Sequence, residues 1–386
     1  MTGIDRRRLT AVLAGLAALP FVGRGRASGR AAFASARFGA SGAAVALLDA
    51  DGAESATQAL PERGHGLAIA PDGRRLVVVA RRPGRWALVL STDDLAPLAR
   101  LALPAGRHFY GHGCFSADGQ RFFTTENDTD GGDGIVGVWD ATAGFERIAE
   151  WRSGGVGPHD LALAPDGRRL IVANGGIRTH PDSGRDMLNR DTMQPTLAAL
   201  SLDDGSVVER VDLGAELRLA SIRHLAVAVD GEVVFGCQFE GDKSVMPPLV
   251  GAWRPGGGAA RLWEMPDAAL ARLDDYVGSV ALDRSGTVVA ATSPRGGTTA
   301  FFARGSGRFL GLADLADVCG VAAAGDGFLL TSGAAGMRRT GAIGAATRLV
   351  DPQPTAARSI WDNHLAAFGD RRQRSAETNR LVKLTV

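Results

Sequence analysis

The sequence has little of several features that would indicate a function directly. Its three cysteines, Cys114, Cys237 and Cys319, are too few and too far apart for a disulfide framework or a CxxC zinc site. The 43 basic and 42 acidic residues almost cancel, so charge provides no reason to expect nucleic acid or an anionic membrane surface as a partner. GxSxG, HExxH and Walker A motifs are absent from the sequence, which removes the usual evidence for a serine hydrolase, a zinc protease or a P-loop enzyme.

Long hydrophobic stretches are also missing, so we expect no stable membrane span. The N-terminus has the basic residues Arg6, Arg7 and Arg8, then a mild apolar run over residues 9–22, then small residues up to Ala31. This order is typical of an export signal, and paired arginines indicate the twin-arginine pathway, which exports folded proteins. We therefore predict a twin-arginine export signal over residues 1–31 and a periplasmic location. A basic cytosolic N-terminus and an uncleaved anchor are the alternatives.

What the sequence does have is glycine and a repeat. The 52 glycines follow no G-X-Y period, so they indicate many tight turns. A polar residue, often His, is followed by alternating apolar residues, an Asp-Gly pair and a second β-rich run, and the copies start about 40 to 65 residues apart. The clear copies start at His65, His112, His159 and His224, and the weaker copies start at Ser279, Gly320 and His364.

Repeats of this length with several short strands are typical of a β-propeller. In the second unit we place four strands near 112–117, 121–126, 135–140 and 146–151. Strands near 43–49 and 55–60 precede the first full repeat, and an inner-strand copy at 360–368 ends the series, so both termini should close the last blade. The predicted fold class is all-β: one seven-bladed β-propeller domain with four-stranded blades, formed by residues 32–386.

Five of the seven histidines occupy the same place in the repeat, at the predicted first position of an inner strand. The inner strands of a propeller line its central channel and run in the same direction, so these imidazoles should converge on one mouth of the channel. A single histidine in this place would more simply cap a strand, but the repetition favours a binding site. The five residues are His65, His112, His159, His224 and His364.

The connections between second and third strands should open on the same face of the propeller. In the third blade this connection, residues 174–196, is long, and a long loop in a compact domain usually has a function. Any single polar residue of these loops would be explained as part of a solvated face. Taken together, the loops and inner strands add the candidates Glu126, Asp160, Arg178, His180, Arg223, Glu240, Arg295 and Asp362.

Imidazole, carboxylate and guanidinium groups together suit a metal site with an anion beside it. Neutral imidazoles bind Cu, Zn, Fe and Ni, and carboxylates shift the preference toward iron or manganese, so iron or copper fits best. Besides the five repeated histidines, the candidate metal ligands are His180, Glu126 and Glu240. Asp160 and Asp362 would bind or orient the imidazoles. Arg178, Arg223 and Arg295 would hold an anionic group.

Several longer strings carry a resemblance to a known family. NGGIRTHPDSGRDMLNRDTMQPT, SIRHLAV, YVGSVA, TSPRGG, DVCGVA and WDNHLAAF resemble the bacterial family called domain of unknown function 1513, over nearly all of the mature chain. The resemblance implies an exported propeller of the lactonase-like and quinoprotein-like kind. The family's genes often lie beside imelysin-like iron-regulated proteins and a di-haem oxidoreductase, which implies a role in iron acquisition with other periplasmic iron-uptake proteins. It supplies no catalytic residues.

We therefore predict a monomeric periplasmic protein that binds a metal ion or an anionic metal chelate, with iron favoured, and we favour binding over catalysis. Cys319 would add a soft ligand if it faced the channel, although a buried thiol is the commoner fate of a lone cysteine. A second hypothesis is a lactonase-like hydrolase that uses a metal- or histidine-activated water at the same site. A third is an interaction platform whose repeated histidines are structural.

Overall fold

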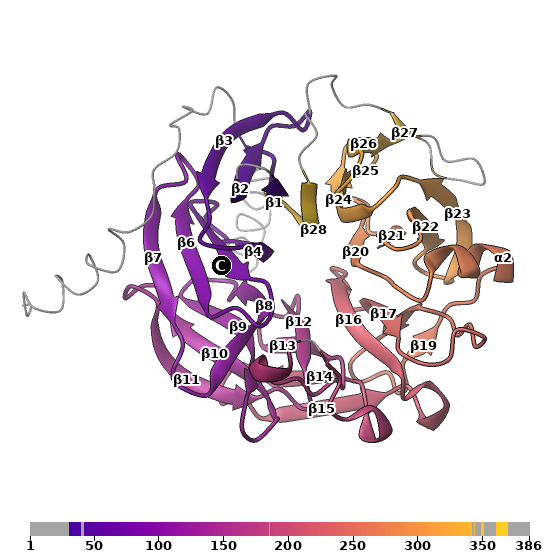
Figure 1. Ribbon diagram of the computed structural model, residues 1–386, viewed down its shortest axis with the longest axis horizontal. Coiled ribbons are helices and arrows are strands. Elements are labelled where there is room, and N and C mark those ends of the chain that lie inside the picture. Colours follow the sequence, from indigo (N-terminus) through magenta and orange to yellow (C-terminus); the bar gives the residue numbers. More distant parts are fainter. Residues whose placement is uncertain are drawn as a thin grey trace, which may run out of the picture.

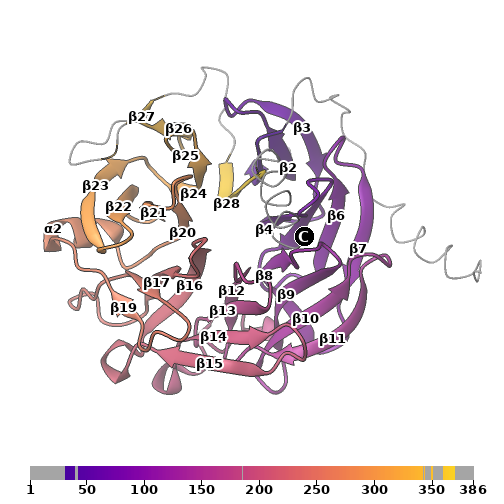
Figure 2. The ribbon, with the colours of Figure 1, turned by 180° about the vertical axis from the view of Figure 1, so that it is seen from behind.

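The chain forms seven four-stranded antiparallel sheets that follow one another around a common axis (Figure 1, and from the opposite side Figure 2). The structure is a computed structural model that describes residues 31–39, 42–184, 186–341, 343, 349–350 and 360–369. The predicted seven-bladed β-propeller with four-stranded blades is confirmed. Residues 1–30 of the predicted export signal lie outside the described residues.

Each blade has four strand positions, counted outward from the axis. The innermost strands are β4 (Gly64–Ile69), β8 (Arg107–Phe115), β12 (Pro158–Leu163), β16 (Ala220–Val227), β20 (Ser279–Leu282), β24 (Val318–Ala324) and β28 (Ile360–Ala367). The second strands are β1 (Phe33–Gly39), β5 (Arg75–Ala80), β9 (Arg121–Asp128), β13 (Arg169–Asn174), β17 (Val233–Phe239), β21 (Val288–Ser293) and β25 (Gly327–Ser332).

The third and fourth positions complete the blades. The third strands are β2 (Gly42–Leu48), β6 (Trp86–Ser91), β10 (Gly134–Asp140), β14 (Thr196–Ser201), β18 (Val250–Trp253), β22 (Thr298–Ala303) and β26 (Gly336–Thr340). The outermost strands are β3 (Glu54–Ala59), β7 (Pro97–Ala102), β11 (Glu146–Arg152), β15 (Val207–Asp212), β19 (Arg261–Leu262), β23 (Arg308–Asp314) and β27 (Leu349–Val350).

Helical segments are short and lie in the connections. They are α2 (Asp267–Leu270) and the 3-10 turns η1 (Pro181–Ser183), η2 (Arg190–Thr192), η3 (Ala215–Leu217) and η4 (Ala271–Leu273). Among the described residues, none of these helices has the length and apolar character that a membrane crossing requires.

The seventh blade combines strands from both ends of the chain, as predicted. Its order is β28-β1-β2-β3, and β28 pairs with β1 from Phe33↔Ala367 to Phe38↔Ile360. The sequence pattern predicted β2, β3 and β28 but not β1. The β1 sequence FASARFG has only a weak alternation of apolar and polar residues, so its pairing partners define it more than its own pattern does.

The second and third strands are buried on both faces because neighbouring blades pack against each side. β5 is a continuous apolar run, RLVVVA, and not an alternating one. Val77 and Val79 belong to the same core cluster as Phe122 of the next blade. Val78 packs on the opposite side with Val45 of the seventh blade. Burying each such side chain contributes about 1.5–3 kcal/mol, so the contacts between blades hold the ring together.

The Asp-Gly pairs form the turns that the repeat predicted. In the first four repeats the aspartate Oδ1 accepts a hydrogen bond of 2.8–3.2 Å from the N–H two residues further on. The following glycines have φ between 65° and 85°, a conformation that residues with a Cβ rarely adopt. The four aspartates are Asp72, Asp118, Asp166 and Asp230.

Candidate metal centre

The repeated histidines lie in or beside a bulge of their inner strands. The repeat predicted that each histidine is the first residue of its strand, which is wrong because the strands continue through the bulge. In β12, Pro158 pairs with Asn174 and Asp160 pairs with Ala173, so His159 between them is the extra residue. The registers of β4, β8, β16 and β28 shift at the same place. A bulge leaves a residue unpaired and redirects its side chain, here toward the channel.

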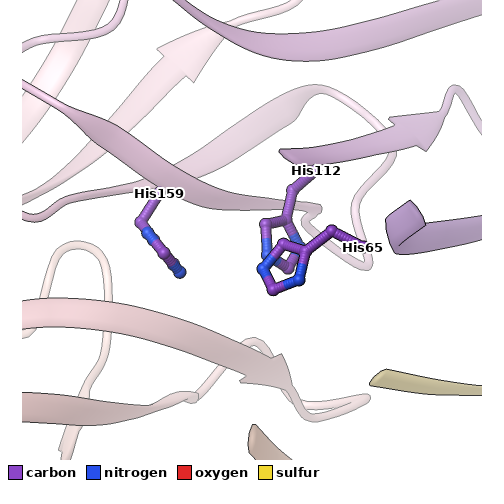
Figure 3. A group of neighbouring side chains, drawn as sticks. All are labelled: His65, His112 and His159. Atoms are coloured by element: carbon purple, nitrogen blue, oxygen red, sulfur yellow. The ribbon is translucent and has the colours of Figure 1, made fainter. Parts of the chain in front are cut away.

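The five imidazoles meet one another in the channel, as the repeat predicted. Eight pairs of their rings have centres between 4.5 and 6.2 Å apart. His112 contacts all four other members, with ring centres 4.5–5.6 Å apart. Figure 3 shows His65, His112 and His159 extending from their strands into a shared space. We call these five residues, His65, His112, His159, His224 and His364, the histidine cluster.

Two overlapping triads of the cluster have the spacing of a metal site. In His65–His112–His159 and in His112–His224–His364, one nitrogen from each residue lies within 4.8 Å of the others. The Nε2 atoms of His65 and His364 are 3.3 Å apart. Metal–imidazole bonds of about 2.0–2.1 Å place two tetrahedral ligand atoms about 3.4 Å apart, so this pair already has the separation of two ligands of one ion.

Asp362 positions His65. It is 1% exposed, its Oδ1 lies 3.1 Å from His65 Nδ1, and Arg63 and Arg81 form ion pairs with its Oδ2. Burial alone would raise the pKa of this carboxyl, but the bond with His65 and the two arginines outweigh burial and hold the pKa well below its usual range. An ionised carboxylate only accepts, so His65 Nδ1 donates the proton and Nε2 keeps its lone pair for the channel.

Asp160 has the same relation to His112 and lies near a second member of the cluster, His224. Its Oδ1 lies 3.2 Å from His112 Nδ1, and its Oδ2 lies 3.9 Å from His224 Nδ1 and accepts from the N–H of Leu225. Burial would raise the pKa of Asp160, but both histidines and the Leu225 N–H lower it below the ordinary value. Asp160 therefore fixes His112 with Nδ1 as donor and Nε2 directed away from the carboxylate.

Burial keeps four members of the cluster uncharged, namely His65, His159, His224 and His364. It lowers the pKa of His65 to about 4, although the hydrogen bond with Asp362 opposes the shift. Burial first, and then neighbouring arginines and histidines, hold the pKa values of His159, His224 and His364 well below 6.5. Neutral imidazole is the form that binds a metal, so these side chains need no deprotonation near neutral pH.

Some of the cluster's nitrogens have no protein partner. His224 is 2% exposed, and neither of its ring nitrogens has a hydrogen-bond partner among the described residues. The same is true of His112 Nε2 within the described part of the chain. A buried polar group without a partner costs about 1–3 kcal/mol. A cation held by these lone pairs would remove that cost.

The cluster separates two cavities. The larger has a volume of about 620 Å³, and we call it the mouth cavity. His65 and His159 form part of its wall. The smaller, of about 190 Å³, is lined by His112, His224 and His364, and we call it the channel cavity. Ser279, which occupies the histidine position in the fifth blade, also lines the channel cavity. The cluster can therefore be reached from two sides.

Loops at the ends of the second strands form much of the mouth cavity, as expected from the topology. Asp186, Met187 and Arg190 come from the long connection after β13, and Arg295 follows β21. Arg223 of β16 donates from Nη2 to Glu240 over 3.1 Å, and both residues line the cavity. Three residues that the sequence singled out, Arg223, Glu240 and Arg295, thus lie beside the cluster at this mouth.

Other predicted site residues lie elsewhere. Glu126 is fully buried within its blade, where it accepts from Thr124 and Arg147. His180 accepts the Asp182 N–H through Nδ1 and is 34% exposed, and Arg178 donates to the Asp130 carbonyl. None of Glu126, His180 and Arg178 lines either cavity in the described part of the chain. The Cys319 thiol is buried and donates to the Asp317 carbonyl, and it belongs to neither triad.

The sequence did not predict four residues of the mouth cavity. Arg81, Arg82, Tyr110 and Tyr276 all line it, and no repeat position marks them. One signal was available: Tyr110 and Tyr276 are the only tyrosines in the chain.

Fold and site together define a class of protein: a seven-bladed β-propeller with a cluster of five histidines in its channel. The chain belongs to the family described as protein of unknown function (DUF1513), whose model matches residues 58–368. This span includes every member of the histidine cluster. The family resemblance expected from the sequence is confirmed.

The other comparisons support the fold only. A comparison with curated proteins gave no match. Hydrazine synthase from Kuenenia stuttgartiensis has 14% identity and a TM-score of 0.58, with 75% of this chain and 86% of that chain covered. The β-propeller domain of Cps50 (Swd1) from Myceliophteria thermophila has 11% identity and a TM-score of 0.57, with 86% and 98% covered. At such identities the likeness shows a shared propeller fold and nothing about ligands.

Proposed function

We propose that this protein binds one metal ion in the histidine cluster. The observation that carries the proposal is the convergence of five imidazoles from five blades, with two ionised carboxylates behind them. Asp362 and Asp160 each accept from Nδ1 of a cluster histidine, which directs Nε2 into the cluster, where Nε2 of His65 lies 3.3 Å from Nε2 of His364. A carboxylate that orients an imidazole in this way is the usual support of a metal ligand.

The donor set limits the choice of metal. Imidazole nitrogens suit copper, zinc, iron and nickel, whereas calcium and magnesium prefer oxygen ligands. We favour iron, with copper as the alternative. If the predicted export signal operates, the site works in the periplasm, where the protein would take part in iron acquisition or homeostasis. The metal would arrive as a free ion or as an anionic chelate through the mouth cavity.

Metal titration of the apo-protein tests this proposal. Fe(II), Fe(III), Cu(I), Cu(II) and Zn(II) are added separately to protein without an affinity tag, and binding is followed by calorimetry. We expect saturation at one ion per chain for iron or copper. The double variant His112→Ala/His224→Ala removes one ligand from each of two blades and should lose this binding.

His180→Ala is the matched control, because His180 is a histidine outside the cluster. This variant should bind metal as the unmodified protein does. Far-ultraviolet circular dichroism and thermal unfolding establish that the variants remain folded. Equal metal binding by the unmodified protein and the folded double variant would contradict the proposal, and so would a loss in His180→Ala as large as that in the double variant.

A further inference from the structure

Guanidinium groups surround the mouth cavity, and the histidine cluster does not explain them. They come from four blades, so positive charge is distributed around the wall and not gathered on one side. The lining contains five arginines and two carboxylates, Asp186 and Glu240, an excess of three positive charges, and Arg81 also forms an ion pair with Asp362 behind the lining. The five are Arg81, Arg82, Arg190, Arg223 and Arg295.

Two of these arginines have hydrogen-bonding capacity that the protein does not use. Arg223 is only 8% exposed, and its Nε has no hydrogen-bond partner among the described residues. Nη1 of Arg81 also lacks a hydrogen bond within the described part of the chain, and its ion pair with Asp362 is long, at 3.5 Å. A buried N–H without an acceptor is costly, and both side chains line the cavity, so an anion there would supply the acceptor.

The two tyrosines show which kind of anion fits. One face of each ring already has a guanidinium over it, since Arg82 lies 5.1 Å from the centre of Tyr110 and Arg295 lies 5.0 Å from that of Tyr276. A planar ligand ring would have to compete with these arginines for that face. The Tyr276 hydroxyl accepts from Asn363 over 3.0 Å, which leaves its own proton to be donated to a ligand. The lining thus offers N–H and O–H donors to an oxyanion.

We propose that the mouth cavity binds a small organic anion with several carboxylate groups, one of which completes the coordination of the metal beside His65 and His159. A planar guanidinium binds a carboxylate through two parallel hydrogen bonds. A single small oxyanion cannot reach arginines on four blades, but an extended polycarboxylate can. The volume of about 620 Å³ lies within the usual range of small-molecule sites. The coordination step rests on the proposed metal site, whereas binding of the anion does not.

Calorimetric titration of the metal-free protein tests the anion site. Tricarballylate, with three carboxylates, is compared with acetate, which has one, and with pyrophosphate, a polyanion without carboxylates. We expect tricarballylate to bind about tenfold or more tightly than either. The double variant Arg190→Gln/Arg295→Gln, altered at two exposed positions, should bind tricarballylate about tenfold or more weakly. Arg178→Gln is the control, because Arg178 is also exposed but does not line the cavity. The affinity of this variant for tricarballylate should change less than about twofold.

Three results would overturn the anion site: equal affinity for acetate and tricarballylate, tighter binding of pyrophosphate, or equal losses in Arg178→Gln and the double variant.

The same titration on metal-loaded protein tests the coordination step. Metal and tricarballylate should each raise the affinity of the other by the same factor, and an unchanged affinity would overturn that step. If tricarballylate binds but no metal does, the proposed metal function fails and the anion site stands. If metal binds but no polycarboxylate does, the anion site fails and the proposed metal function stands.

Discussion

At the scale of single residues, the site depends on buried polar atoms that the protein alone does not pair. His224 has two such nitrogens, and His112 and Arg223 have one each among the described residues. Asp160 and Asp362 are different: they are buried but well paired, and they hold the neighbouring imidazoles in one orientation. The sequence marked all five residues as site candidates, because each histidine, aspartate or arginine lies in or next to the repeated position.

Asp362→Asn tests the orienting role of this carboxylate. Asparagine keeps the shape but loses the charge that attracts the His65 Nδ1–H and pairs with Arg63 and Arg81. Loss of such a support typically weakens metal binding about 10- to 100-fold, and we expect a loss of that size in a metal titration. Asp133→Asn, at an exposed carboxylate paired with Arg152, is the control. An unchanged metal affinity in Asp362→Asn would show that Asp362 does not support a ligand.

His108 should give the fold a pH dependence that is separate from the metal site. It is 1% exposed, neither ring nitrogen has a hydrogen-bond partner among the described residues, and burial, with Arg82 and Arg85, lowers its pKa from 6.5 to about 4. His108 is protonated below about pH 6.5 in the unfolded chain but only below about pH 4 in the folded protein. Stability therefore falls as the pH drops through this window.

His108→Phe removes this contribution and leaves those of the other buried histidines in place. At pH 4.5 the lost stability from His108 amounts to about 2–3 kcal/mol, at about 1.4 kcal/mol per unit of pKa difference. Urea unfolding at pH 7 and pH 4.5 measures it. Between pH 7 and pH 4.5, the free energy of unfolding should fall by about 2–3 kcal/mol less in His108→Phe than in the unmodified protein. Equal falls in the two proteins would mean that His108 takes up its proton at an ordinary pH when folded.

At the scale of elements, bulges in the inner strands turn the repeated histidines into one cluster. A glycine beside each of two of them lets adjacent inner strands approach. Gly111 has φ +114°, and a Cβ there would lie 2.6 Å from Cδ2 of His65. The repeat predicted which histidines would meet. It did not predict the bulges, because an extra unpaired residue depends on the partner strand and leaves no periodic signal in the sequence.

Gly111→Ala should disturb the cluster without removing a ligand. The new methyl group would push the His65 ring and strain the backbone, so we expect a loss of metal affinity of about tenfold or more and a loss of stability of about 1–3 kcal/mol. Gly144→Ala is the control for strain alone, because Gly144 also has positive φ, at +71°, but a Cβ there has no atom within 4 Å. Metal titration and thermal unfolding compare the two. If both variants bind metal equally well, the packing of Gly111 against His65 does not matter for the site.

At the scale of the whole molecule, the site exists only when the ring is closed. Asp362 and His364 lie on β28, the last described strand, whereas His65 lies on β4, near the start of the propeller. Pairing of β28 with β1 brings these residues into contact. The sequence predicted the blade count, the closure and the five histidines from the repeat. It predicted Arg223 and Arg295 of the mouth cavity but missed Arg81 and Arg82, because these two lie in the connection between β5 and β6, after the repeated sequence ends.

An engineered disulfide tests the closure. Phe38 and Ile360 are paired residues of β1 and β28, both exposed, and paired residues in antiparallel strands have Cα atoms about 4.5–5.5 Å apart, within the reach of a disulfide. We expect Phe38→Cys/Ile360→Cys to form a cross-link under oxidising conditions, seen as faster migration on a non-reducing denaturing gel, and to raise the melting temperature. The control pair Phe38→Cys/Val229→Cys places the second cysteine in another blade and should form no cross-link. Similar cross-linking of both pairs would contradict the closure.

Elemental analysis of the protein as isolated shows whether the histidine cluster holds a metal. The protein is purified from periplasm without chelator or histidine tag, beside the folded His112→Ala/His224→Ala variant. We expect about one iron or copper per chain in the unmodified protein and none in the variant. Absence of metal from both, even after incubation with iron and copper under reducing and oxidising conditions, would contradict the proposed metal site.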